Sequence, residues 1–212
     1  MTKEQILESL KSNSTVKIRK AAIELRKNPV EGICELLYEA YNRDLVTKNS
    51  WETQSELIVT AGLLGCKSFL LPIKAICDSN IEYDTTTSRS GLSYVRLKRV
   101  DLSDVSPVLE YLEDAKYSLG FGILYALGFD KMIPTPKEQM TIIQHFWNFG
   151  MDRDRRGLSD PRYGLAAACA GWDKETVKDF LNHCINTGDE PTKFIASEAQ
   201  KNKYAKHRLL LY

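Results

Sequence analysis

Residues 159–172 read SDPRYGLAAACAGW, and this stretch shows how the chain is built. An alanine-rich run follows an aspartate and a proline, and it stops at a glycine and a tryptophan. The side-chain oxygen of Ser159 or Asp160 can accept from the free N–H groups of a first helical turn, and Pro161 suits the first helical position. Gly171 can adopt the left-handed conformation that ends a helix. The stretch therefore predicts a closely packed helix with both ends marked.

The same plan occurs at three other places in the chain. Each unit has a polar start, a helix rich in small residues, a break, and a second amphipathic helix. The units begin at Ser14, Ser50, Glu113 and Ser159, and their breaks fall at Asn28-Pro29, Gly65, Gly128 and Gly171. In the last unit, Asp173 is the predicted N-cap of the second helix. The spacing of about 40 residues between most units is typical of stacked helix pairs.

Three segments fall outside this plan. Residues 3–11 and 191–206 predict single helices that cap the two ends, and the final LLLY is expected to pack back on the body. Residues 79–104 form the only long region with few helix-forming residues, and LSYVRLKRV at residues 92–100 is its best strand candidate. We therefore expect an insertion that projects as a basic loop or hairpin, with a flexible excursion as the alternative.

The four units resemble HEAT-type helical repeats. The resemblance is carried by TVKIRKAAIEL at residues 15–25 and DPRYGLAAACAGW at residues 160–172, with leucine-glycine breaks in TAGLLGCK and ILYALGFD. It covers most of residues 14–187 and is specific for architecture. The resemblance implies an all-α solenoid of about four helix pairs in a single domain, residues 1–212. It also implies a concave surface, lined by the second helices, where partners bind.

Charge and hydropathy narrow the classes of partner. The chain has 29 lysine and arginine residues against 28 aspartate and glutamate residues, a net charge of +1. A general nucleic-acid binder usually has a clear basic excess, so we expect no nucleic-acid partner. No stretch approaches the roughly 20 apolar residues of a membrane span, and the N-terminus lacks the apolar core of a signal peptide. We therefore expect no membrane partner and a cytoplasmic location.

The reactive side chains do not predict catalysis. The cysteines are Cys34, Cys66, Cys77, Cys169 and Cys184, and the histidines are His145, His183 and His207. No CxxC pair occurs and no cysteine has a suitably placed activating neighbour, so buried, reduced thiols are expected. The histidines lie far apart, and no phosphate loop or GxSxG motif is present. We expect no catalytic residue, metal, cofactor or small-molecule substrate.

Three groups of residues are candidates for binding another protein. An acidic stripe on the second helix of the first unit comprises Glu31, Glu35, Tyr38, Glu39 and Asn42. The predicted insertion contributes Arg96, Lys98 and Arg99. The turn before the fourth unit contributes Asp152, Arg153, Asp154, Arg155, Arg156 and Arg162. Arginines in a short loop contact carboxylates or phosphates well, although this loop could also neutralise itself, and the stripe could be a solvated face.

Several functions stay open at this point. The resemblance favours a non-catalytic protein-binding module, because the repeat motif concerns packing. A small freestanding HEAT-like protein is similar to bacterial immunity proteins of contact-dependent toxin systems, which bind and neutralise a cognate toxin domain. A general scaffold or regulatory adaptor is an alternative of the same class. The enzyme alternative is a HEAT-like DNA glycosylase for alkylated bases, which would use Trp147, Trp172, Asp152 and Asp154.

Overall fold

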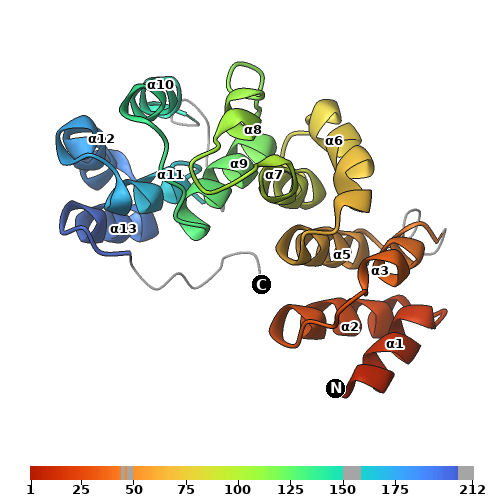
Figure 1. Ribbon diagram of the computed structural model, residues 1–212. Coiled ribbons are helices and arrows are strands. Elements are labelled where there is room, and N and C mark those ends of the chain that lie inside the picture. Colours follow the sequence, from red (N-terminus) through yellow and green to blue (C-terminus); the bar gives the residue numbers. More distant parts are fainter. Residues whose placement is uncertain (44–45, 47–49, 150–158, 205–212) are drawn as a thin grey trace.

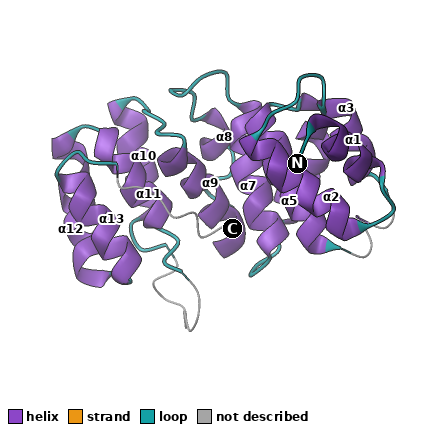
Figure 2. Ribbon diagram, turned by 90° about the horizontal axis from the view of Figure 1, so that it is seen from below, coloured by secondary structure: helices purple, strands orange, loops and turns teal. Residues whose placement is uncertain are grey.

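The computed structural model describes residues 1–43, 46, 50–149 and 159–204. Every regular element in these residues is helical, with twelve α-helices, two short 3-10 helices and no strand (Figure 2). The all-α prediction is therefore confirmed. Within the same residues, no helix combines the length and the apolar character needed to cross a bilayer.

The elements follow one another along the chain with short connections. Their order is α1 (Lys3–Lys11), α2 (Thr15–Lys27), α3 (Cys34–Tyr41), α5 (Trp51–Leu64), η1 (Lys67–Phe69), α6 (Leu70–Ser79), α7 (Thr85–Lys98), α8 (Ser106–Leu109), α9 (Tyr117–Phe129), α10 (Pro136–Phe146), α11 (Tyr163–Ala168), η2 (Cys169–Gly171), α12 (Lys174–Thr187) and α13 (Glu190–Gln200).

The helices form two rows that follow the same arch (Figures 1 and 2). The inner row contains α2, α5, α7, α9, α11 and α13, and each of these helices packs against the next. The outer row contains α1, α3, α6, α8, α10 and α12 on the convex side. Helices α1, α6 and α12 pack extensively on α2, α7 and α13. Packing therefore runs in series from one end of the arch to the other.

The predicted breaks are largely found, but the rows differ from the expectation in one respect. Helix α2 ends before Asn28, and α5 ends at Gly65, whose φ of 72° is left-handed as a C-cap glycine requires. The second helices of the predicted units, such as α3 and α6, nevertheless lie in the outer row (Figure 1). The inner side of the arch is formed by the first helices instead.

The predicted insertion is wrong, because its residues form α7, which packs between α5 and α9 in the inner row. Its sequence, TTTSRSGLSYVRLK, is rich in residues of low helix propensity, which is why it does not look helical. Residues 86–97 are all buried. Asp84 begins the helix by accepting from the N–H of Thr87 at 2.6 Å. Burial between two neighbours thus outweighs local propensity.

Small residues allow the inner helices to approach closely. A Cβ on Gly62 of α5 would lie 2.7 Å from Oγ of Ser93 on α7. A Cβ on Gly122 of α9 would overlap the carbonyl oxygen of Ser88 on α7. Between α9 and α11, a Cβ on Gly164 would lie 2.5 Å from the carbonyl oxygen of Leu124. These glycines are required by helix contact rather than by turn geometry.

The start of α11 differs from its prediction by two residues. The helix begins at Tyr163, so Pro161 precedes it and neither predicted residue is the N-cap. Asp160 still accepts from a backbone N–H, that of Arg162, at 3.0 Å. Its carboxylate also binds the guanidinium of the same arginine, and this side-chain pair replaces a simple cap.

The end of the same stretch is also different in detail. Gly171 does not have a positive φ, and it belongs to the 3-10 helix η2. A Cβ there would overlap the hydroxyl of Tyr204, so the glycine makes room for a distant ring. The N-cap prediction for Asp173 is confirmed, because its carboxylate accepts from the N–H of Thr176 at 2.9 Å.

The two terminal helices exist, although they are ordinary members of the rows. Helix α1 spans Lys3–Lys11, as the sequence predicts. Helix α13 spans Glu190–Gln200 and is shorter than the predicted 191–206. The LLLY segment lies outside the described residues.

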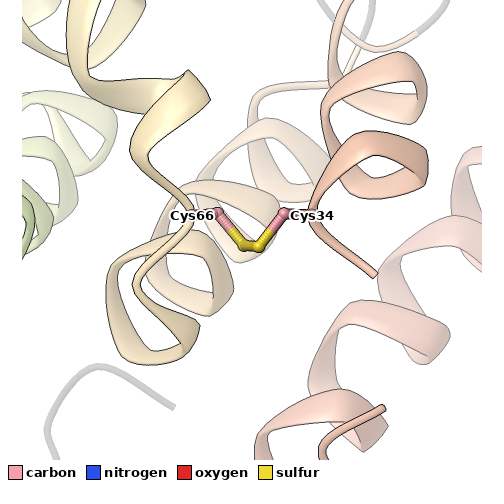
Figure 3. Close-up of a disulfide and its surroundings, with 2 residues drawn as sticks. All are labelled: Cys34 and Cys66. Carbon is pink, nitrogen blue, oxygen red and sulfur yellow. A yellow bond between two sulfur atoms is a disulfide. The ribbon is translucent and has the colours of Figure 1, made fainter. Parts of the chain in front are cut away.

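A disulfide joins Cys34 to Cys66, which corrects the prediction of reduced thiols for these two residues (Figure 3). The Sγ–Sγ distance is 2.04 Å and the Cα–Cα distance is 5.2 Å. The bond ties the N-terminus of α3 to the turn after α5. Such a bond is unusual for the predicted cytoplasmic location, because thiols in the cytosol are normally kept reduced. The compartment itself stays a prediction.

The other three cysteines are buried free thiols, as expected. Burial raises the pKa of Cys77 and of Cys184 to about 12, and it also raises the pKa of Cys169. A thiol reacts through its thiolate, so these groups are unreactive in the folded protein at neutral pH.

We predict that Gly122→Ala destabilises the protein by about 3 kcal/mol, because the new methyl group must displace the backbone of α7. Urea unfolding followed by circular dichroism measures the loss. The reverse substitution at an exposed helical site, Ala75→Gly, is the control and should cost about 1 kcal/mol. A smaller loss for Gly122→Ala than for the control would contradict the close approach of α7 and α9.

Counting thiols with Ellman's reagent tests the disulfide and the burial together. We expect none of the five cysteines to react in the folded, unreduced protein. Three should react after unfolding in guanidinium chloride, and five after unfolding and reduction. Five reactive thiols in the unfolded but unreduced protein would show that the bond does not form.

Candidate functional site

The predicted acidic stripe lies on the outer surface of the arch. The exposed residues of the stripe are Glu31, Glu35, Glu39 and Asn42. Tyr38 is half-buried and its ring packs edge-on against Phe69 at 5.3 Å, so it holds α3 in place. Glu31 belongs to the turn before α3 rather than to the helix. The carboxylates are available to a partner, but on the convex side.

The predicted basic residues of the insertion do not form a docking surface. Arg96 and Arg99 both bind the carboxylate of Asp130 at 2.7 Å, and all three side chains are largely buried. The Arg96 guanidinium also lies 4.9 Å from the centre of the Phe129 ring. Only Lys98 is exposed. The arginines therefore fasten α7 to the end of α9, because the segment that carries them is a buried helix.

The prediction that Arg162 belongs to a binding surface is also wrong. Its side chain is fully buried, and its Nη2 lies 2.6 Å from Oδ2 of Asp160. Its Nη1 donates to the hydroxyl of Thr187 at 3.1 Å, which connects α11 to the end of α12. The other candidates of this turn, Asp152, Arg153, Asp154, Arg155 and Arg156, lie outside the described residues.

The two tryptophans of the glycosylase alternative are packing residues. Trp147 follows α10 in the outer row, and its ring stacks on His183 of α12 at 5.0 Å. Burial, followed by the charge of Arg162, lowers the pKa of His183. Trp172 is buried and donates its indole N–H to the carbonyl of Met132 at 2.8 Å. Both side chains are therefore engaged in packing contacts.

The inner side of the row carries a buried charge cluster. Glu56 of α5 binds Arg26 of α2 and, at 2.6 Å, Arg89 of α7. Arg89 and Arg96 are seven residues apart and therefore share one side of α7. Tyr94 lies on the other side, where its ring contacts Tyr111 near the outer row at 5.4 Å. The arginines thus lie on the side of α7 away from Tyr94 and the outer row.

Aromatic rings continue this inner face along α9. Tyr117, Phe121, Tyr125 and Phe129 recur every four residues, and successive ring centroids are 6.2, 5.5 and 6.4 Å apart. Tyr125 also stacks on Tyr163 of α11 at 6.0 Å. The four-residue spacing is visible in the sequence YSLGFGILYALGF. The sequence does not mark one face of the helix, however, because the whole segment is apolar. The stripe becomes recognisable only once the packing of α9 is known.

The aromatic stripe leads to exposed apolar side chains at the N-terminal ends of the inner helices. Tyr83, just before α7, lies 5.6 Å from Tyr117. The exposed fractions are 51% for Val16, 56% for Trp51, 56% for Ile81 and 55% for Tyr83. We call these four residues the apolar rim. Large aromatic residues in such positions are the usual anchors of protein interfaces.

Hydrogen bonds align the helix ends behind the apolar rim. The Thr53 hydroxyl of α5 donates to the carbonyl of Thr15 at the start of α2. The hydroxyls of Ser55 and Thr86 lie 3.1 Å apart and join α5 to α7. At the next junction, the N–H of Asp84 donates to the Ser118 hydroxyl of α9 at 2.8 Å. The rim residues therefore lie at the N-terminal ends of three consecutive inner helices, α2, α5 and α7.

Tyr83 holds an unusual backbone conformation. Its φ is 57°, in the left-handed region that costs a non-glycine residue roughly 1–2 kcal/mol. Bulky residues in this region are genuine outliers, and such outliers cluster at binding sites. Asparagine and glycine fit this conformation better, so the tyrosine is unfavourable for the turn, while its ring contacts Tyr117.

Other kinds of site find less support in the described residues. No three side chains of histidine, cysteine, aspartate and glutamate gather there as they would to hold a metal ion. A cleft of about 370 Å³ between α12 and α13 is lined by mixed charged, amide and aliphatic side chains, with Lys174, Lys178 and Asn182 among them.

No protein-family model matches the chain, and no curated protein or solved structure is significantly similar to it.

We predict that Asp130→Asn destabilises the protein by about 3 kcal/mol, since it leaves two largely buried guanidinium groups beside each other without a counter-charge. Chemical unfolding gives the value. The exposed control Glu113→Gln should change it by less than about 0.5 kcal/mol. Equal effects for the two variants would show that the Asp130 cluster does not hold α7 to α9.

Proposed function

We propose that the protein is a non-catalytic, protein-binding α-solenoid whose partner docks on the apolar rim. Grouping each outer helix with the inner helix that follows it gives six HEAT-like pairs: α1–α2, α3–α5, α6–α7, α8–α9, α10–α11 and α12–α13. The grouping differs from the sequence-based one by one helix. It includes the expected insertion and both expected caps as ordinary members.

Hydrogen bonds between neighbouring units support the solenoid. The Thr60 hydroxyl donates to the Ala22 carbonyl, 38 residues away. The bond from Asp84 to Ser118 spans 34 residues, and the bond from Trp172 to the Met132 carbonyl spans 40. Each distance in sequence corresponds to about one helix pair, which is the signature of units that contact only their neighbours.

The apolar rim is the single observation that carries the binding proposal. Its four members lie on one edge, and each is more than half exposed. An exposed apolar patch with aromatic anchors marks an interaction site more often than an isolated apolar residue does. The rim continues inward into the buried aromatic stripe of α9, so its rings have a firm base.

Within this class we favour an immunity protein that binds and neutralises a cognate toxin domain. The HEAT-like pattern and the small size support it, and a curved array offers a large surface for covering a toxin. A scaffold or adaptor would use the same rim. The engagement of Trp147 and Trp172 in packing contacts makes the glycosylase the less favoured candidate.

A growth assay tests the proposed function. The chain is co-expressed with the toxin domain encoded next to it in the native genome, and it should restore growth. Trp51→Ala and Tyr83→Asn should weaken the complex by about 30-fold each in calorimetry, as expected for interface anchors. Asparagine tolerates the left-handed backbone, so Tyr83→Asn should keep the thermal stability.

Leu71→Ala is the matched control, because Leu71 is 80% exposed on α6 in the outer row. It should bind the toxin domain like the original chain. If the chain fails to restore growth but binds another protein through the rim, the immunity function is wrong and a scaffold function replaces it. Full affinity in both rim variants would refute the rim as the binding surface.

A further inference from the structure

The surface around the apolar rim is acidic where it crosses α7 and α9. The exposed charged residues in segments 80–85 and 113–117 are Glu113, Asp114 and Lys116, and the half-buried ones are Glu82 and Asp84, of which Asp84 caps α7. Glu52, next to Trp51, adds a fifth carboxylate. This excess is local, because the whole chain has a net charge of +1.

The two acidic segments lie against each other. The side-chain amide of Asn80 donates to the carbonyl of Asp114 at 2.6 Å, and its oxygen accepts from the N–H of Lys116 at 3.1 Å. The contact between the Tyr83 and Tyr117 rings joins the same segments. The carboxylates of Glu113 and Asp114 therefore belong to a segment that lies against the segment of Ile81 and Tyr83.

Exposed aromatic rings among carboxylates attract cations. A ring face stabilises an ammonium or guanidinium group by about 0.5–1 kcal/mol at exposed sites, and nearby carboxylates add to the attraction. The same combination occurs within this protein, where the Lys74 ammonium lies 5.6 Å from the Tyr111 ring centre and 2.8 Å from Asp78. Arginine and lysine also have aliphatic stems that cover apolar side chains.

We infer that the apolar rim recognises a basic protein surface. Lysine or arginine heads of the partner lie on the rings of Trp51 and Tyr83, between the carboxylates of Glu52 and Glu113. Their stems and neighbouring apolar side chains cover Ile81. This inference rests on the proposed function and adds the chemical class of the partner. A nucleic acid does not fit the same surface, because the carboxylates repel its phosphates.

Fluorescence anisotropy with defined probes tests the inference. The probes are a fluorescein-labelled peptide of alternating arginine and leucine, its counterpart of glutamate and leucine, and a single-stranded oligothymidine. The arginine peptide should bind, and added salt should weaken it, whereas the other two should not bind. Binding of the oligothymidine or of the glutamate peptide would overturn the inference.

Two sets of variants show whether the rim is responsible. Trp51→Ala should weaken binding of the arginine peptide about 5–10-fold, and so should the double variant Glu113→Gln with Asp114→Asn. The control carries the same charge change on exposed residues of α12, Glu175→Gln with Asp179→Asn, and should bind the peptide normally. Equal weakening by both double variants would mean that only net charge matters, which overturns the inference.

The toxin domain separates this inference from the proposed function. If Trp51→Ala weakens the toxin complex but the Glu113 and Asp114 double variant does not, the rim binds the toxin without a preference for basic surfaces. If the arginine peptide binds as expected but the toxin domain does not, the basic preference holds and the immunity function fails.

Discussion

Close contact between neighbouring helices of the inner row is the constraint on which the rest of this structure depends. Gly62, Gly122 and Gly164 occupy positions where a methyl group would meet the next helix. The serines of α7 serve the same purpose, because small side chains allow backbones to approach. Each inner helix therefore packs on the next one, and α7, which local propensity would leave as a loop, becomes a helix at the centre of the row.

Buried ion pairs reinforce this serial packing. Glu56 joins α2, α5 and α7 through Arg26 and Arg89, and Asp130 receives two arginines at the junction of α7 and α9. A buried charge is costly without a partner, so each pair favours one relative placement of its helices. The arginines that the sequence predicts as surface residues thus form buried ion pairs inside the arch. The candidate binding residues are instead those at the helix ends, which the packing of the rows leaves exposed.

The sequence by itself determined the helical class and the punctuation of most helices. The breaks at Asn28 and Gly65, the cap at Asp173 and the bounds of α1 follow from local rules, because caps and left-handed glycines act within one turn. The acidic residues of α3 were likewise readable, since charges at four-residue spacing share one face of a helix.

Only the tertiary structure decided which helices form each row, that α7 is a helix, and which charged residues are buried. The Cys34–Cys66 bond depends on the packing of α3 against α5. Tyr83 and Trp51 both lie at the N-terminal ends of inner helices, whose alignment depends on hydrogen bonds between neighbouring helices. Most of these features join residues about one helix pair apart, and a local pattern in the sequence contains no information on contacts at that distance.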